Sequence, residues 1–431
     1  MAATWLRRAG ELAVSRYDLD EGIRLLHQAV ELETHATTQA ELWREIGRAN
    51  ALGFQGPAFW EAMERSLELT DDRSTRGETY AELGFQTSFR GGMWTRAPDR
   101  TLVSPWIAKG IELTDPGTPA RVKALSAHVF WDANPAADAA REASATADEL
   151  GDPDLRAVAL YGRAIVAYQA GRFDEALEWV LRPLDFIDQL NDPERVVEVY
   201  EATVPVDAML GRFKAARAMS ELHRAATQPL SAHHRLHGIA VRTELEEVSG
   251  EWTTVRDLTP RIEQTVAENL NTPCVRNERT LLVAAAASRT LGDVAESERL
   301  EAKAESLGME GYDLVLSAPR VRLALLKDDL VGVERLLSSL PTILGRKHSY
   351  WFNLSSQVLR LDALLRLGDS AAIENEAVPL LEHRRTYIEP FAQRALGHVR
   401  GDRSLIEQAL ARFEELGLGW HAGQTRPLLT A

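Results

Sequence analysis

The sequence predicts an all-α protein, an α-solenoid of about eleven stacked antiparallel helical hairpins wound into a right-handed superhelix. Three observations support this fold class. Turn signals recur about every 38 residues, apolar side chains between the turns follow a helical period, and one segment is nearly repeated. The repeated segment is "AGRFDEALEW" from Ala170, which returns as "LGRFKAARAM" from Leu210. Each hairpin has an apolar stripe that it cannot bury alone, so stacking on its neighbours is expected.

The hairpin around Gly171 shows the pattern in detail. The stretch "LRAVALYGRAIVAYQA" from Leu155 is rich in alanine, has no proline and carries apolar residues at helical spacing, so it predicts a helix that ends at Gly171. Asp174 is expected to cap the second helix, and "NDP" from Asn191 is expected to end it. The apolar stripe of this second helix is formed by Ala176, Leu177, Val180, Leu181, Leu184 and Ile187.

The same turn signals recur along the whole chain. They fall near Tyr17, Gly53, Trp94, Asn134, Gly171, Gly211, Gly250, Gly292, Asp328, Gly368 and Gly401. We therefore expect a single solenoid over residues 1–431, with an N-terminal capping hairpin (1–36), an irregular loop within the array (89–106) and a C-terminal capping segment (390–431).

Composition narrows the possible partners and compartments. The formal net charge of −15 argues against nucleic-acid binding, which needs clustered Lys and Arg, and makes a basic peptide the easier partner. The one cysteine, Cys274, excludes an internal disulfide and fits a reducing compartment, so the cytoplasm is expected. Charged residues near the start leave no room for an apolar signal core, and no apolar run is long enough to span a bilayer.

Sequence marks of catalysis are missing. The motifs GxxxxGK[ST], HExxH, CxxC and GxSxG do not occur, so we expect neither an enzyme nor a cofactor. The segment "GLGWHA" from Gly417 formally fits a dinucleotide fingerprint, but it follows a helical pattern rather than a strand. It is interpreted as a helix end, with Trp420 packing back on the final hairpin.

Two further segments have both a structural and a functional interpretation. His233 and His237 are spaced like two metal ligands on one helical face, but no third ligand is identifiable, so a solvated helix start or groove-lining histidines are favoured over a metal site. The loop from Phe89 carries Trp94 and Trp106, which either cover the edge of the core or form a contact loop for a partner.

Three short segments carry a family resemblance. "YQAGRFDEAL" from Tyr168, "GRFKAA" from Gly211 and "LLHQAVEL" from Leu25 resemble the turn and second helix of tetratricopeptide repeats. In that pattern Gly171 is the turn glycine, Phe173 the aromatic residue after it and Ala176 the small residue where the two helices meet. The resemblance implies a protein-binding scaffold or sensor array.

The two ends of the chain carry a second resemblance. "WLRRAGELAVSRYDLDEGIRLLHQAVEL" from Trp5 and "ALARFEELGLGWHAGQTRPLL" from Ala409 are similar to the boundaries of the repeat region in large actinobacterial-type signalling proteins. Those proteins carry an ATPase module, often with a class III nucleotide cyclase or a LuxR-type DNA-binding domain. The alternative is therefore a regulatory region separated from its effector, while an enzyme or small-ligand receptor is least favoured.

The first helix of each tetratricopeptide hairpin lines the concave face, and the resemblance places a set of residues there. Counting back from the turn glycines gives Tyr161, Tyr168, Glu198, Glu201, His237, Glu244, Glu247, Arg279 and Arg289. The glutamates either attract a basic segment or belong to an ordinary solvated face. The Lys and Asn of the family's carboxylate clamp are replaced by residues such as Tyr161 and Ile165, which argues against a receptor for C-terminal tails.

Overall fold

The computed structural model describes residues 1–131, 136–338, 340 and 350–430. Over these residues the chain forms 23 α-helices and three short 3-10 helices, without a strand, which confirms the predicted all-α class. The predicted turn at Asn134 lies outside the described residues. Among the described helices, none is both long and apolar enough to cross a lipid bilayer.

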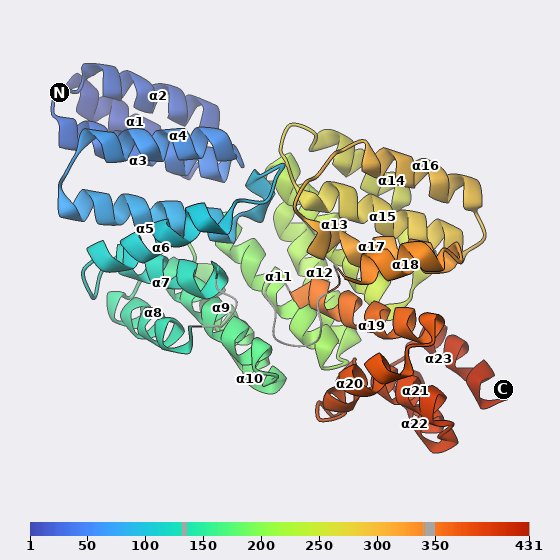
Figure 1. Cartoon of the computed structure of the whole chain (residues 1–431). Helices are drawn as coiled ribbons and strands as arrows, with labels where there is room; N and C mark the ends of the chain where they lie inside the picture. Colours follow the sequence, from blue (N-terminus) through green and yellow to red (C-terminus); the bar gives the residue numbers. More distant parts are fainter. Residues whose placement is uncertain (132–135, 339, 341–349, 431) are drawn as a thin grey trace. The chain divides into compact units, whose positions relative to one another are not determined.

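The helices follow one another as eleven antiparallel pairs, from α1/α2 to α21/α22, with α23 after the last pair (Figure 1). Their bounds are α1 (Ala2–Ser15), α2 (Leu19–Leu32), α3 (Ala36–Leu52), α4 (Gly56–Leu69), α5 (Arg73–Phe89), α6 (Arg100–Leu113), α7 (Pro119–Trp131), α8 (Ala137–Leu150), α9 (Pro153–Gln169), α10 (Phe173–Leu181), α11 (Pro193–Met209), α12 (Phe213–Thr227), α13 (Ala232–Ser249), α14 (Trp252–Glu268), α15 (Val275–Thr290), α16 (Val294–Glu305), α17 (Asp313–Leu326), α18 (Leu330–Leu337), α19 (Tyr350–Leu367), α20 (Ser370–Leu380), α21 (Glu389–Arg400), α22 (Arg403–Glu415) and α23 (Gly419–Thr425). The 3-10 helices are η1 (Gly91–Met93), η2 (Arg182–Gln189) and η3 (Arg426–Leu429).

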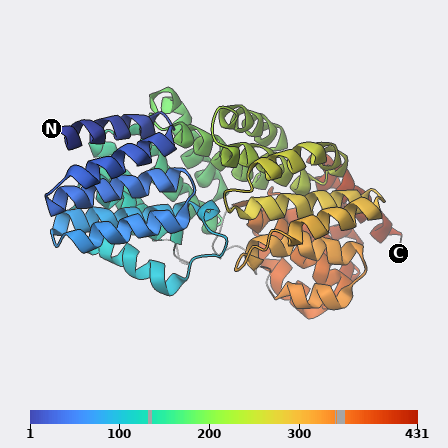
Figure 2. The ribbon, with the colours of Figure 1, turned by 90° about the horizontal axis from the view of Figure 1, so that it is seen from above.

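Contacts divide the chain into two compact units. Unit 1 comprises Met1–Val166, Arg182–Val196 and Asn271–Cys274, and unit 2 comprises Ala167–Leu181, Val197–Leu270 and Val275–Ala431. The sequence predicted one array, and its repeat pattern gave no sign of this division. Within each unit, the first helices of consecutive hairpins pack side by side, as α3, α5 and α7 do in unit 1 and α13, α15 and α17 do in unit 2 (Figure 2).

Left-handed backbone conformation marks most of the predicted turns, and at three of them the left-handed residue is not a glycine. Tyr17, Phe54 and Asp328 have φ values of 60°, 57° and 58°. L side chains disfavour this region, so the turn geometry here is imposed by the packing of the two helices that it joins. The hairpin geometry is therefore the same whether or not the sequence supplies a glycine.

The second helix of the Gly171 hairpin is shorter than predicted. The apolar stripe suggested one helix as far as Ile187, whereas α10 ends at Leu181 and continues as the 3-10 helix η2, with a break at Phe186. Pro183 lacks the backbone N–H that an α-helix needs at this point, which accounts for the change.

An aspartate caps the second helix of the last hairpin and provides a test of local helix stability. The Oδ1 atom of Asp402 accepts hydrogen bonds from the backbone N–H groups of Ser404 (3.0 Å) and Leu405 (3.2 Å). We expect Asp402→Ala to lower the free energy of unfolding by about 1 kcal/mol, whereas Asp402→Asn, which caps equally well, stays near wild type. Urea unfolding followed by circular dichroism measures both variants. An equal loss in the two would show that the charge, rather than the cap, stabilises the helix.

Candidate functional site

The first helices of unit 1 carry ion pairs from one hairpin to the next. Arg44 on α3 pairs with Glu78 on α5 at 2.6 Å. Glu82 on α5 is shared by Arg48 on α3, at 3.7 Å, and Lys123 on α7, at 2.7 Å. Burial alone would raise the pKa of Glu82, but Lys123 and Arg48 lower it to about 2. The carboxylate of Glu82 is therefore neutralised by basic groups of its own unit.

A second charged cluster lies in unit 2, where Arg276 on α15 is its central cation. The Nη1 atom of Arg276 lies 2.7 Å from Oε1 of Glu201 on α11, and Nη2 lies 3.2 Å from Oε2 of Glu244 on α13. Nη1 also donates a hydrogen bond to Nδ1 of His237 at 2.9 Å. Two of the glutamates that the sequence assigned to a groove are therefore bound by one arginine.

Arg279 continues this cluster one turn further along α15. Its Nη2 atom donates to Oε2 of Glu247 at 2.8 Å and to Oγ of Ser355 on α19 at 3.1 Å, and its Nε lies 3.8 Å from Glu244. The side chains of Arg279, Glu247 and Glu244 are only 1%, 2% and 3% exposed. The ion pairs are thus buried rather than solvated.

The path of the helices explains this burial. Within unit 2, α13 packs on α15 and also contacts α19, so the helices curve round and bring Ser355 to the arginine. A residue on the inner side of α13 or α15 therefore meets protein atoms from several hairpins. We call these charged residues the inner charge cluster: Glu244, Glu247, Arg276 and Arg279, which are buried, and Glu201, which is partly exposed.

Burial and pairing shift the ionisable groups of this cluster in different directions. Burial would raise the pKa of Glu201, but Arg276 and the two neighbouring histidines hold it well below its ordinary value. Burial raises the pKa of Glu247 despite the opposing fields of Arg279 and Arg322. Burial and the charge of Arg276 lower the pKa of His237 to about 4, so this imidazole is neutral at pH 7. A basic partner would have to compete with Arg276 and Arg279 for these carboxylates.

The other residues assigned to the groove occupy varied environments. In unit 1, the ring of Tyr161 lies 5.6 Å from that of Phe130. In unit 2, Tyr168 is buried with its ring 5.0 Å from Phe173, Glu198 is half-buried on α11, and Arg289 lies 4.0 Å from Glu298 at the end of α15.

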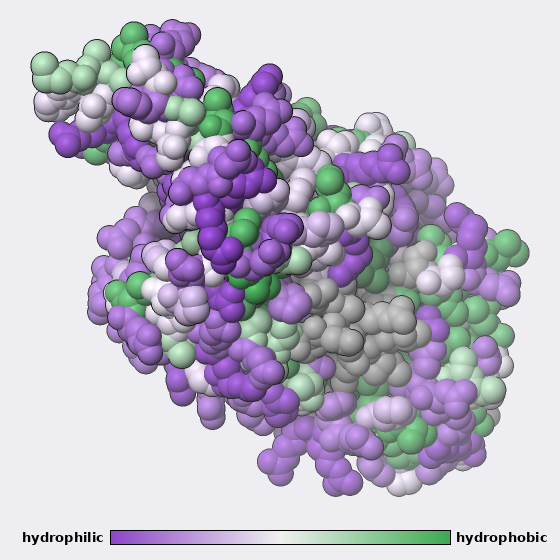
Figure 3. All heavy atoms as spheres, turned by 60° about the vertical axis from the view of Figure 1, so that its left-hand side comes forward, coloured by the Kyte–Doolittle hydropathy of each residue, from purple (hydrophilic) through white to green (hydrophobic). Residues whose placement is uncertain are grey.

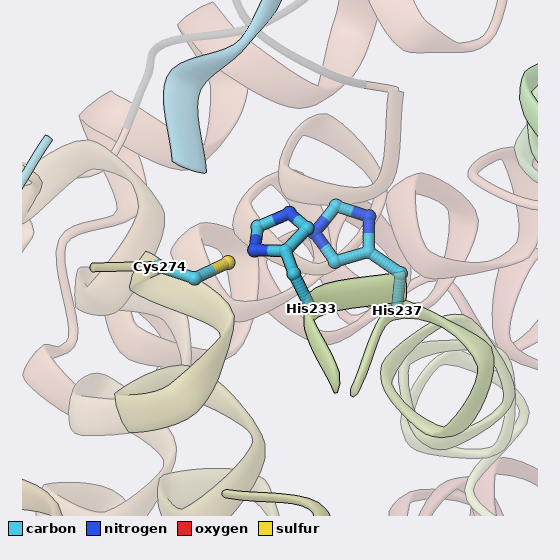
Figure 4. Close-up of side chains that lie close together, drawn as sticks. All are labelled: His233, His237 and Cys274. Atoms are coloured by element: carbon cyan, nitrogen blue, oxygen red, sulfur yellow. The ribbon is translucent and has the colours of Figure 1, made fainter. Parts of the chain in front are cut away.

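His233 and His237 do share one face of α13, with ring centroids 4.4 Å apart. Figure 4 shows the two imidazole rings side by side on this helix. His233 is 2% exposed, so the expectation of a solvated helix start is wrong for this residue.

Trp94 and Trp106 lie against the core of unit 1. The ring centroid of Trp60 on α4 is 4.2 Å from that of Trp94 and 5.3 Å from that of Trp106, and Trp94 is only 5% exposed. This arrangement agrees with the interpretation that the loop covers the edge of the core. Elsewhere on the surface, Figure 3 shows hydrophobic residues scattered among hydrophilic ones on the face drawn, which is ordinary for a protein surface.

Trp420 does not pack where the sequence suggested. It was expected on the final hairpin, but its ring lies 5.5 Å from that of Trp252 on α14, and the guanidinium of Arg322 on α17 lies over both rings. These contacts join residues far apart along the chain, which local helical patterns do not encode.

Arg276 and Arg322 were missed by sequence reasoning, although a signal for Arg276 existed. Several arginine–carboxylate pairs between first helices are separated by nearly one repeat length: Arg7 and Glu41 by 34 residues, and Arg276 and Glu244 by 32. A search for opposite charges at the spacing of the repeat would have found such pairs. Arg322 has no comparable signal, because its partners are aromatic rings of distant hairpins.

Comparisons with known proteins identify the fold but no family by sequence. No protein-family model matches the chain, and no curated protein matches it either. Among solved structures, a Rap protein complexed with competence and sporulation factor aligns with a TM-score of 0.56 and 11% identity, over 86% of this chain and 99% of that one. Yeast Tom70 aligns with a TM-score of 0.39 and 11% identity, over 99% and 95% of the two chains. The P58(IPK) TPR domain gives a TM-score of 0.27 at 11% identity, over 100% and 99%.

The first of these alignments, together with the eleven helical pairs, supports the architecture that the sequence predicted. The chain has an all-α solenoid fold, similar to that of the Rap protein.

Proposed function

We propose that this chain is a non-catalytic scaffold that binds a protein or peptide along the first helices of its hairpins. The observation that carries the proposal is the fold: the chain aligns, over most of its length, with a Rap protein whose structure was determined in complex with another factor. Stacked hairpins provide a long, rigid surface, and such surfaces commonly bind polypeptide segments. The single, buried cysteine supports a cytoplasmic location for this scaffold.

The charged first helices give the proposed surface its chemistry. In unit 1, Arg48 and Glu78 are each nearly half exposed beside the buried Glu82. In unit 2, Glu201 and His237 keep about a quarter of their side chains exposed at the edge of the inner charge cluster. We propose that a partner meets the charges of unit 2 at this edge, with the partly exposed Glu198, Glu201, His237 and Arg289 along its path.

A basic segment is the proposed partner, because Glu201 is the inner carboxylate that remains partly exposed and ionised. The affinity of Glu201 for a Lys- or Arg-rich segment should fall as the salt concentration rises, since exposed charges are screened beyond about 8–10 Å at physiological ionic strength. A partner identified by affinity capture of the full chain from its native lysate, followed by mass spectrometry, can be titrated directly for this effect.

We expect Glu201→Gln to weaken binding of the captured partner by roughly tenfold and to reduce the salt dependence, because one charge-assisted contact is lost. Isothermal titration at two salt concentrations measures both quantities. Glu178→Gln is the matched control, since Glu178 is exposed on α10, a second helix. Equal effects of the two variants, or no effect of Glu201→Gln, would place recognition away from the inner charge cluster.

A further inference from the structure

The C-terminal hairpin of unit 2, α21 to α23, docks on the ends of helices much earlier in the same unit. The backbone N–H of Tyr387, just before α21, donates to the carbonyl oxygen of Met209 at 2.7 Å. The Tyr387 hydroxyl and Nε2 of His421 both donate to the carbonyl oxygen of Val248, at 2.7 and 3.1 Å. Met209 is the last residue of α11 and Val248 lies in the last turn of α13. The hairpin therefore satisfies carbonyl groups that helix ends leave without an intrahelical partner.

His421 is the titratable group in this contact, and its surroundings favour the neutral ring. The imidazole is 1% exposed and lies against the rings of Phe391 and Phe413, with centroids 4.8 and 5.7 Å away. A carbonyl oxygen can only accept a hydrogen bond, so Nε2 carries the proton and Nδ1 is unprotonated in the neutral ring. Nδ1 is buried and has no hydrogen-bond partner among the described residues.

The charged groups near His421 are mostly cationic. Arg322 on α17 and Arg394 on α21 both act on the ring, and Asp362 on α19 pairs with Arg394. Burial, followed by the fields of Arg394 and Arg322, keeps the pKa of His421 well below its ordinary value. Tyr387 and Glu247 are further titratable groups beside the docked hairpin, and burial raises the pKa of both. Arg412 on α22 adds another cation to the hairpin and donates to the carbonyl oxygen of Arg385.

We propose that the C-terminal hairpin is a latch that closes the inner charge cluster of unit 2 and opens when His421 is protonated. A second proton would sit on Nδ1, in a buried position without an acceptor and beside two arginines, so the docked state excludes it. Release of the hairpin lets water solvate the imidazolium and exposes the cluster to a partner. The inference rests on the proposed binding function, for which it supplies the regulation.

The sign of the pH effect follows from linkage. The pKa of His421 is lower in the docked state than in the released state, so the docked state binds fewer protons. Docking is favoured above about pH 6.5, the ordinary value for histidine, and is lost progressively as the pH falls below it. If one proton is taken up on opening, the open population rises about tenfold for each pH unit below that value.

Hydrogen exchange of the full chain, without any partner, tests the latch. Protection factors of the α23 amides, corrected for the intrinsic exchange rate at each pH, are measured between pH 7.5 and 5. In the wild type we expect protection to fall about tenfold per pH unit below about pH 6.5. His421→Gln retains a donor for Val248 but does not titrate, so its protection should not depend on pH.

Another histidine of the same hairpin serves as the matched control. His398 is exposed on α21. His398→Gln should keep the wild-type slope. If His421→Gln fails to fold, the pH profiles of the wild type and the control still test the proposal. Protection of the α23 amides that does not change with pH in the wild type overturns the latch. An unchanged slope in a folded His421→Gln variant also overturns it, whether or not a binding partner exists.

Discussion

Replacing Arg279 with methionine should lower the free energy of unfolding by about 3–5 kcal/mol, the range found when one member of a buried ion pair is removed. The arginine is 1% exposed and contacts Glu247, Glu244 and Ser355. Methionine keeps much of the aliphatic volume, so the loss reports on charge rather than on a cavity. Equilibrium urea unfolding followed by circular dichroism measures the change.

Arg299→Met provides the control for this prediction. Arg299 bridges Glu263 and Glu296 with good geometry, but its side chain is 48% exposed on α16, so less than about 1 kcal/mol should be lost. Adding Glu247→Gln to Arg279→Met should recover part of the stability, because Glu247 is the buried carboxylate whose ion pair with Arg279 is lost. Equal losses in Arg279→Met and Arg299→Met would mean that the inner charge cluster is solvated in solution.

The pH dependence of Arg279→Met provides an independent check. Burial already raises the pKa of Glu247, and loss of Arg279 removes a field that lowers it. A carboxyl group whose pKa is raised on folding stabilises the folded state at low pH and loses that contribution as the pH rises. The deficit of the variant relative to wild type should therefore shrink between pH 7 and pH 5.

The fold could be predicted from the sequence because each hairpin is encoded locally. Helical periodicity and turn residues lie within one repeat, and even turns without glycine, such as those at Tyr17 and Asp328, adopt the left-handed conformation. The early end of α10 also has a local cause. Pro183 lies within the apolar stripe and breaks the α-helix that the stripe predicts.

The candidate site could be predicted only in part. Counting from the turns placed Glu244, Glu247 and Arg279 on the same side of their helices, and these side chains do contact one another. Their burial involves α19, which contacts α13 and brings Ser355 to Arg279. Contacts over such distances in sequence follow from the curvature of the stacked hairpins, which no single repeat specifies.

The last prediction concerns the contact between the C-terminal hairpin and the turn after α11. Gly211 and Gly368 both have φ of 71°, so a side chain at either position should cost about 1–2 kcal/mol from the backbone alone. A Cβ atom on Gly211 would lie 2.4 Å from Cδ2 of Leu416, just after α22, whereas one on Gly368 would meet nothing within 4 Å. We expect Gly368→Ala to lose only the backbone cost, and Gly211→Ala to lose about 1–3 kcal/mol more, because the C-terminal hairpin must shift to accommodate the methyl group.

Urea unfolding measures this difference between the two glycine variants, and hydrogen exchange locates it. In Gly211→Ala the extra loss should appear as weaker protection of α22 and α23, with the helices of unit 1 unchanged. Because both variants carry the same backbone strain, equal losses would show that Leu416 yields without cost and that the C-terminal hairpin is not held firmly against the turn after α11. A larger loss in Gly211→Ala would instead show that the C-terminal hairpin packs closely on this turn and needs a residue without a side chain at position 211.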